Sequence, residues 1–108
     1  MATNTFTNAF LKDVGTTAAT LYTPPATQKS ILIELDVSNT ANTGVTVDVY
    51  ITRSAVNYYI GKQLPVPVGG TLQVVSGQKI VLLATDTIKV VSSVAASIDV
   101  VSSILEDI

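Results

Sequence analysis

The sequence predicts an all-β protein, folded as a two-sheet antiparallel β-sandwich of about eight strands. Valine, isoleucine and threonine are abundant, and their β-branched side chains favour strands over helices. Two segments alternate apolar and polar residues with a period of two, as half-buried strands do. Turn-forming residues recur at short, regular intervals, as at Gly15, Gly69-Gly70 and Gly77. Together these features are typical of jelly-roll or Greek-key, immunoglobulin-like sandwiches.

The strands can be placed in order along the chain. Residues 1–14 are expected to form an N-terminal arm or an edge strand, and residues 17–23 a short strand. Residues 31–38 place Ile31, Ile33, Leu35 and Val37 on one face and Glu34, Asp36 and Ser38 on the other, with Leu32 as the exception. Residues 45–53 alternate valine and isoleucine with Thr46, Asp48, Tyr50 and Thr52, which are expected to face outward.

Weaker strand patterns follow at residues 57–62, 71–75, 79–83, 87–92 and 97–105. The last of these has a rival interpretation, since Ile98, Val101, Leu105 and Ile108 also fit a helical spacing. Serine and valine dominate the segment and are poor helix formers, so a strand is favoured. Pro65 and Pro67 indicate a loop or a sheet edge, because proline cannot donate a ladder hydrogen bond.

A charge argument separates the two clearest strands. If residues 31–38 and 45–53 formed a hairpin, Asp36 or Glu34 would lie directly opposite Asp48. Like charges directly opposed destabilise a strand pair. The strands are therefore expected in different sheets, joined by an arch across the sandwich.

Length, charge and cysteine content exclude several classes of function. The 108 residues suit one domain, residues 1–108, and the net charge of −2 without a basic cluster argues against nucleic acid. The chain has no cysteine, so disulfides are excluded and a reducing compartment is favoured. The amino end does not resemble a signal peptide, and no apolar run is long enough for a membrane helix.

The side chains that most often serve catalysis near neutral pH, histidine and cysteine, are also absent. Without histidine or cysteine the chain lacks the usual acid–base groups, thiol nucleophiles and zinc ligands, so neither an enzyme nor a cofactor is expected. Glu34, Asp36 and Asp48 are weak candidates for a calcium site or a glycosidase pair. Alternation alone explains them as the solvated faces of two strands, and this interpretation is favoured.

Two features indicate an interface instead. Ile98, Val100 and Ile104 share one face of the last strand, but Val101 and Leu105 make its other face apolar as well. With Val91, they are expected to pack against another subunit. Of Tyr58 and Tyr59, one should pack inward and one outward. The outward ring is expected to contact a protein partner, because tyrosine is enriched at interfaces. The alternative is a carbohydrate-binding surface, to which Tyr50 would also belong.

Four segments of the chain resemble small bacteriophage virion proteins: "TLYTPPATQKSILIELDVSNT", "VTVDVYITR", "PVPVGGTL" and "KIVLLATDTIKVVSSVAASIDVVSSILE". The resemblance rests on turn-and-strand patterns over nearly the whole chain. One departure is Thr85, where many such chains have glycine, which suggests a slightly different turn.

The resemblance implies a β-sandwich repeated on a phage particle, located in the virion and assembled in the bacterial cytoplasm. A capsid decoration or cement protein is favoured, which would stabilise the particle and bind the major capsid protein or another virion protein. A neck, tail or fibre component and a host-glycan-binding module are the alternatives. A homotrimer is expected by analogy with icosahedral shells.

Overall fold

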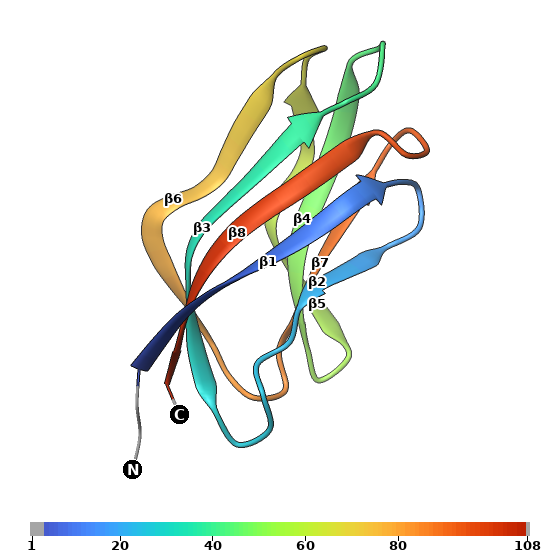
Figure 1. Cartoon of the computed structure of the whole chain (residues 1–108). Coiled ribbons are helices and arrows are strands. Elements are labelled where there is room, and N and C mark those ends of the chain that lie inside the picture. The colour runs from blue at the N-terminus through green and yellow to red at the C-terminus, as the bar shows by residue number, and fades with distance from the viewer. Residues whose placement is uncertain (1–3, 108) are drawn as a thin grey trace.

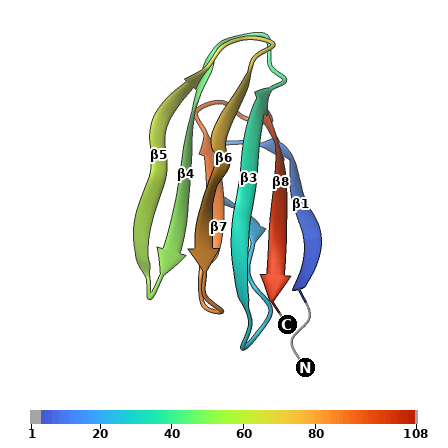
Figure 2. The ribbon, with the colours of Figure 1, turned by 90° about the vertical axis from the view of Figure 1, so that its left-hand side faces the viewer.

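The computed structural model describes residues 4–107, which form eight strands in two antiparallel sheets of four. The first sheet has the order β1-β8-β3-β6 and the second the order β2-β7-β4-β5. Figures 1 and 2 show the sheets stacked as two layers. The eight strands are β1 Asn4–Val14, β2 Ala19–Tyr22, β3 Lys29–Asn39, β4 Val45–Arg53, β5 Val56–Val66, β6 Thr71–Leu82, β7 Thr87–Ser92 and β8 Ile98–Asp107.

This strand order is that of a jelly roll, an eight-stranded double sheet built from Greek keys. The predicted β-sandwich is confirmed, and β3 and β4 lie in different sheets, as the charge argument required. The last segment is a strand, not a helix. Residues 4–14 form an edge strand that pairs with β8, so β1 begins where β8 ends (Figure 1). No helix within residues 4–107 could cross a membrane.

The core lies between the sheets and consists almost entirely of aliphatic side chains from their inner faces. It includes Leu35 and Val37 from β3, Val47 and Val49 from β4, and Ile98, Val100 and Ile104 from β8. Adjacent strands of this kind fit together because β-branched side chains pack well on a pleated surface. The inner and outer faces of β8 therefore alternate as predicted.

The predicted faces of β3 are wrong in its first half. The pairing register shifts between Leu32 and Glu34 against both neighbouring strands, so Ile33 is the extra residue of a β-bulge. A bulge moves all preceding side chains to the opposite face. Leu32 is consequently fully buried, and Ile31 lies on the outer face, aligned with Leu105 and Val81.

The turn predicted at Gly77 is also absent. The segments predicted at residues 71–75 and 79–83 form one strand, β6, which passes through an irregularity at residues 77–79. Gly77 has φ 93° and Lys79 φ 61°, and these left-handed conformations accommodate the irregularity without ending the strand.

Candidate functional site

The outer face of the first sheet carries an apolar row that crosses all four strands. Phe6 is paired with Leu105, Leu105 with Ile31 and Ile31 with Val81. Directly paired residues project to the same side of a sheet, so these four side chains, called here the apolar row, are neighbours. Phe6 is 77% exposed and Val81 55% exposed. The row is an apolar surface that residues 4–107 leave partly exposed to solvent.

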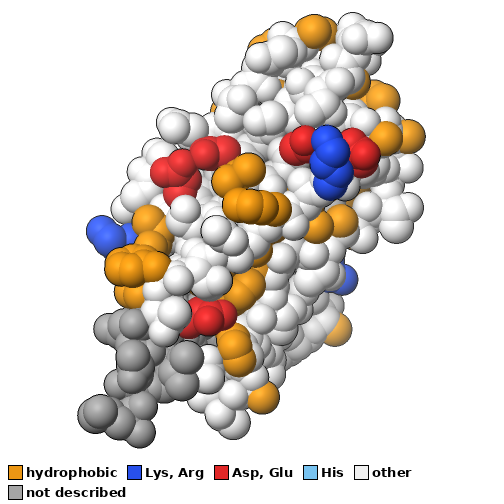
Figure 3. All heavy atoms as spheres, in the orientation of Figure 1, with side chains coloured by type: hydrophobic (Ala, Val, Ile, Leu, Met, Phe, Trp, Pro, Cys, Tyr) orange, Lys and Arg blue, Asp and Glu red, His pale blue; other side chains and the backbone are white. Residues whose placement is uncertain are grey.

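Two further apolar side chains lie on the same face, separated from the row by Asn8 and Ser103. Phe10 is paired with Val101, which is 49% exposed. A shallow groove of about 350 Å³ lies beside them, between β1 and β8. Figure 3 views this side of the molecule and shows groups of hydrophobic side chains among polar and acidic ones. Such a mixture is typical of interfaces, which are seldom uniformly apolar.

An acidic pair, Glu34 and Asp36, lies on this outer face beside the apolar side chains. Asp36 is paired with Val101 and Glu34 with Ser103. Partial burial, helped by the neighbouring Glu34, raises the pKa of Asp36 from 3.8 to about 6. Its Oδ1 atom is shielded from solvent and has no hydrogen-bond partner among the described residues. This carboxylate is therefore poorly solvated at neutral pH.

Replacing Asp36 with asparagine is expected to stabilise the protein at pH 7.5 by about 1 kcal/mol. A raised folded-state pKa means that the ionised side chain opposes folding above about pH 6, and that the penalty disappears as the pH falls below 3.8. The two proteins should have different melting temperatures at pH 7.5 and equal ones near pH 3.5. Equal melting temperatures at both pH values would contradict the assignment.

The third acid of the predicted cluster lies elsewhere. Asp48 belongs to β4 in the second sheet, and its Oδ1 accepts a hydrogen bond from the Gln63 backbone N–H at 2.7 Å. Within the described part of the chain, no three potential metal-ligating side chains gather. The predicted calcium or glycosidase cluster of Glu34, Asp36 and Asp48 is thus not assembled, because the arch between β3 and β4 carries the acids to opposite layers.

The predicted interface residues likewise fall on two surfaces. Val101 and Leu105 lie on the outer face of the first sheet, whereas Val91 is paired with Asp48 on the second. Tyr58 and Tyr59 lie on β5, the edge strand of the second sheet. A single contact surface therefore cannot contain all five residues.

Both tyrosines of this pair are exposed, so the expectation that one packs inward is wrong. Tyr58 shares a face with Ile51, but it lies near the turn between β4 and β5, at the end of the sandwich. Tyr59 packs on Tyr50 with ring centroids 5.0 Å apart, and the Lys62 ammonium lies 4.6 Å from the Tyr59 centroid. Tyr50 is buried beneath these groups although it faces outward, which corrects its assignment as a water-facing residue.

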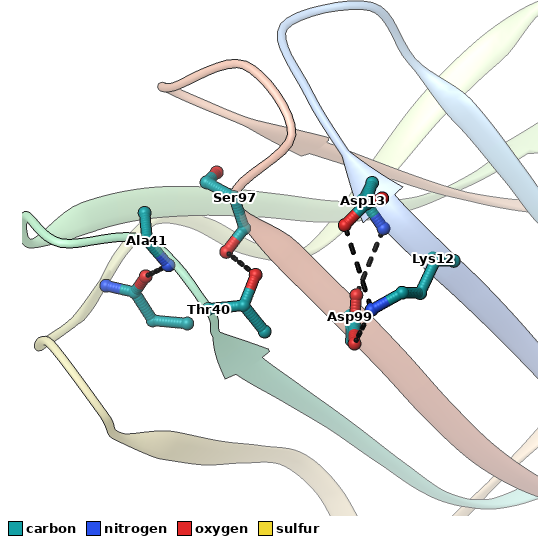
Figure 4. A network of polar contacts seen from close by, with 7 residues as sticks. Lys12, Asp13, Thr40, Ala41, Ser97 and Asp99 are labelled. Carbon is teal, nitrogen blue, oxygen red and sulfur yellow. Dashed lines mark hydrogen bonds and ion pairs between the residues drawn. The ribbon is translucent and has the colours of Figure 1, made fainter.

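Polar contacts fix the end of the sandwich where β1 passes into its loop (Figure 4). Lys12 Nζ donates to Asp99 Oδ2 at 3.1 Å, and the Asp13 backbone N–H donates to Asp99 Oδ1 at 3.0 Å. The Asp13 hydrogen bond, together with Lys12, lowers the pKa of Asp99. Asp99 thereby holds the irregular end of β1, where Asp13 has φ 54°. These contacts join the end of β1 to β8.

Sequence reasoning missed the Lys12–Asp99 ion pair and also a second one, between Arg53 at the end of β4 and Asp86 in the β6–β7 turn. Arg53 Nε and Nη2 each donate to a carboxylate oxygen of Asp86 at 2.6 Å, and the Leu83 N–H donates at 2.8 Å. The Arg53 hydrogen bonds hold the pKa of Asp86 below its usual value. The only sequence signal was an aspartate in a predicted turn.

No protein-family model matches the chain, and no curated protein matches its sequence. Among solved structures, it is similar to a chain of the Bacillus endospore appendages, described as disulfide-linked pili. The TM-score is 0.60 at 15% identity, over 98% of this chain and 88% of that one. A chain of infectious bursal disease virus, Gx strain, is similar with a TM-score of 0.59 at 14% identity.

The viral match covers 100% of this chain but 33% of the viral chain, so this chain spans about a third of that protein's length. At such low identities the likeness concerns the fold alone. Neither match assigns a ligand or a reaction to the residues described above.

Proposed function

We propose that this chain is a non-enzymatic structural protein of a bacteriophage virion, and specifically a capsid decoration or cement protein. The observation that carries the proposal is the partly exposed apolar row on the outer face of the first sheet. Large exposed apolar side chains grouped on one face are typical of surfaces that bind other proteins. A protein that binds only the assembled shell would stabilise that shell by mass action.

The fold supports this proposal without deciding it, since one fold serves many functions. Jelly rolls occur in viral capsid and lectin domains alike. A lectin-like role is less well supported, because Tyr59 is already packed on Tyr50 and contacted by Lys62. A neck, tail or fibre position is the alternative within the virion, although the described residues form no long shaft or repeat of the kind that fibres use.

Purified protein is expected to self-associate, with a trimer as the closed ring that fits a three-fold axis of a shell. The measurement is absolute molar mass by light scattering over a concentration series, against 11.3 kDa for one chain. A mass above that of one chain, rising with concentration, is the expected result. A mass of one chain at every concentration would contradict self-association in solution.

Location on the particle is tested separately, with virions of the phage that encodes the chain. Cryo-microscopy should show the sandwich repeated over the shell, and particles stripped of it should release their DNA at a lower temperature. Density confined to the neck or tail would reject the decoration role in favour of the alternative. Absence of the protein from purified virions would reject the whole proposal.

A further inference from the structure

We infer that two copies of this chain pack face to face through the outer faces of their first sheets, in an isologous contact centred on the apolar row. The inference rests on the proposed assembling function and names the partner and register of that same surface. In such a contact a twofold axis relates the two copies, so that if residue i of one copy contacts residue j of the other, residue j of the first also contacts residue i of the second.

On β3, the apolar row is flanked by one positive and one negative side chain, which can pair with those of a second copy. Lys29 lies two residues before Ile31, and Glu34 follows Ile31 on the far side of the bulge. The partner of Glu34 on β8 is Ser103, which lies two residues before Leu105, the partner of Ile31. Lys29, Ile31 and Glu34 therefore lie on the same outer face, with a cation and an anion on opposite sides of the row.

A twofold axis that runs along the row, across the strands, reverses the strand direction of the second copy. The row then packs on the partner's row, and Lys29 of each copy faces Glu34 of the other. Two interchain ion pairs would form at the flanks of an apolar centre. Opposite charges placed in this way set the register of an interface.

The rival twofold axis, parallel to the strands, is disfavoured by the same register. An axis between β8 and β3 would set Asp36 against the partner's Val101, because these residues are directly paired within one sheet. The carboxyl would then be buried against an apolar side chain without a compensating charge, which is costly. The axis along the row avoids that arrangement.

The available area is sufficient for a stable contact. The molecule measures 48 × 26 × 21 Å, so a broad face offers on the order of 1,000 Å², compared with about 800 Å² per partner in a standard interface. Phe6 contributes the largest exposed apolar side chain of the row, and aromatic residues are enriched at such contacts. An isologous contact joins copies in pairs, so a trimer would need a second, different contact.

The decisive experiment is a charge swap between copies. Lys29→Glu and Glu34→Lys should each weaken self-association by roughly 100-fold, because each homodimer would then oppose like charges at both flanks. An equimolar mixture of the two variants should recover association, since every flank of the mixed dimer pairs opposite charges. Lys62→Glu, on the second sheet, is the matched control and should associate like the parent. Light scattering and native mass spectrometry report the species formed.

Three outcomes are distinguishable when the parent is measured alongside the variants. Recovery specifically in the mixture supports the contact, because folding effects within one chain cannot produce it. If the parent associates but both variants associate equally well, the face-to-face register is overturned while the assembling function stands. If the parent stays monomeric and does not bind virions, both proposals fail.

Val81→Asp should also prevent association, because it places a charge in the apolar row. Circular dichroism should show that this variant remains a folded monomer.

Discussion

Replacing Asp86 with alanine is expected to lower the free energy of unfolding by about 3 kcal/mol. The Asp86 side chain is fully buried, and its carboxylate accepts two hydrogen bonds from Arg53 and one from the Leu83 N–H. The substitution leaves the Arg53 guanidinium and a turn N–H without their acceptor. It also disconnects the end of β4 from the β6–β7 turn. Chemical denaturation monitored by circular dichroism measures the loss.

A second ion pair supplies the matched control. Lys12 pairs with Asp99 at 3.1 Å, but the Lys12 side chain is 75% exposed. Lys12→Ala should leave the melting temperature almost unchanged, because exposed pairs contribute little. Asp86→Asn should fall between the two variants, since the amide retains one acceptor but loses the charge. If Asp86→Ala were as stable as Lys12→Ala, the Arg53–Asp86 ion pair would have no structural role.

The pH dependence of the Asp86 contribution has a definite sign. Arg53 holds the pKa of Asp86 below 3.8, so the ionised carboxylate stabilises the fold at every pH above that value. The contribution is lost as the pH falls through the folded-state pKa. Asp36 behaves in the opposite way, because its pKa is raised. As the pH is lowered from 7 to 4.5, the free energy of unfolding of the parent protein should therefore rise slightly, because Asp36 becomes protonated. Below pH 3.5 it should fall, because Asp86 becomes protonated.

The sequence alone predicted those parts of the fold that depend on local patterns. Residues 45–53 alternate cleanly, and β4 has these bounds. The opposed acids correctly separated β3 from β4. The one sign of the bulge at Ile33 was Leu32, the exception to the alternation, but three consecutive apolar residues do not show which of them is inserted. Gly77 was taken for a turn because the left-handed conformation it allows serves turns and bulges equally.

Only the part of the candidate surface that lies on β8 was predicted from the sequence. Val101 and Leu105 were identified as an unexpected second apolar face of one strand. Their neighbours Phe6, Ile31 and Val81 come from three other strands, and only the strand order brings them together. Val91 has the same local pattern but belongs to the other sheet. A pattern within one segment reveals which face is apolar, but not which segments share that face.

Replacing Asn39 with alanine is the other substitution expected to have a large effect, a loss of about 3 kcal/mol. Asn39 is buried at the end of β3, where the arch to β4 begins. Its Nδ2 donates to the Thr43 carbonyl at 2.8 Å and to the Val66 carbonyl at 3.0 Å, and its Oδ1 accepts from the Ala41 N–H at 2.8 Å. Alanine leaves all three backbone groups without these partners.

Asn57→Ala is the control, because this exposed side chain accepts one hydrogen bond, from Thr52 Oγ1, and its loss should change stability by less than about 0.5 kcal/mol. Asn39→Asp tests which bonds matter. The carboxylate can still accept from Ala41, but at neutral pH it opposes two carbonyl oxygens. That variant should be strongly destabilised at pH 7 and partly recover at pH 4, where the protonated group can donate once. If Asn39→Asp were instead nearly as stable as the parent at pH 7, the Ala41 contact that this variant retains, rather than the two carbonyl contacts, would hold the arch between the sheets.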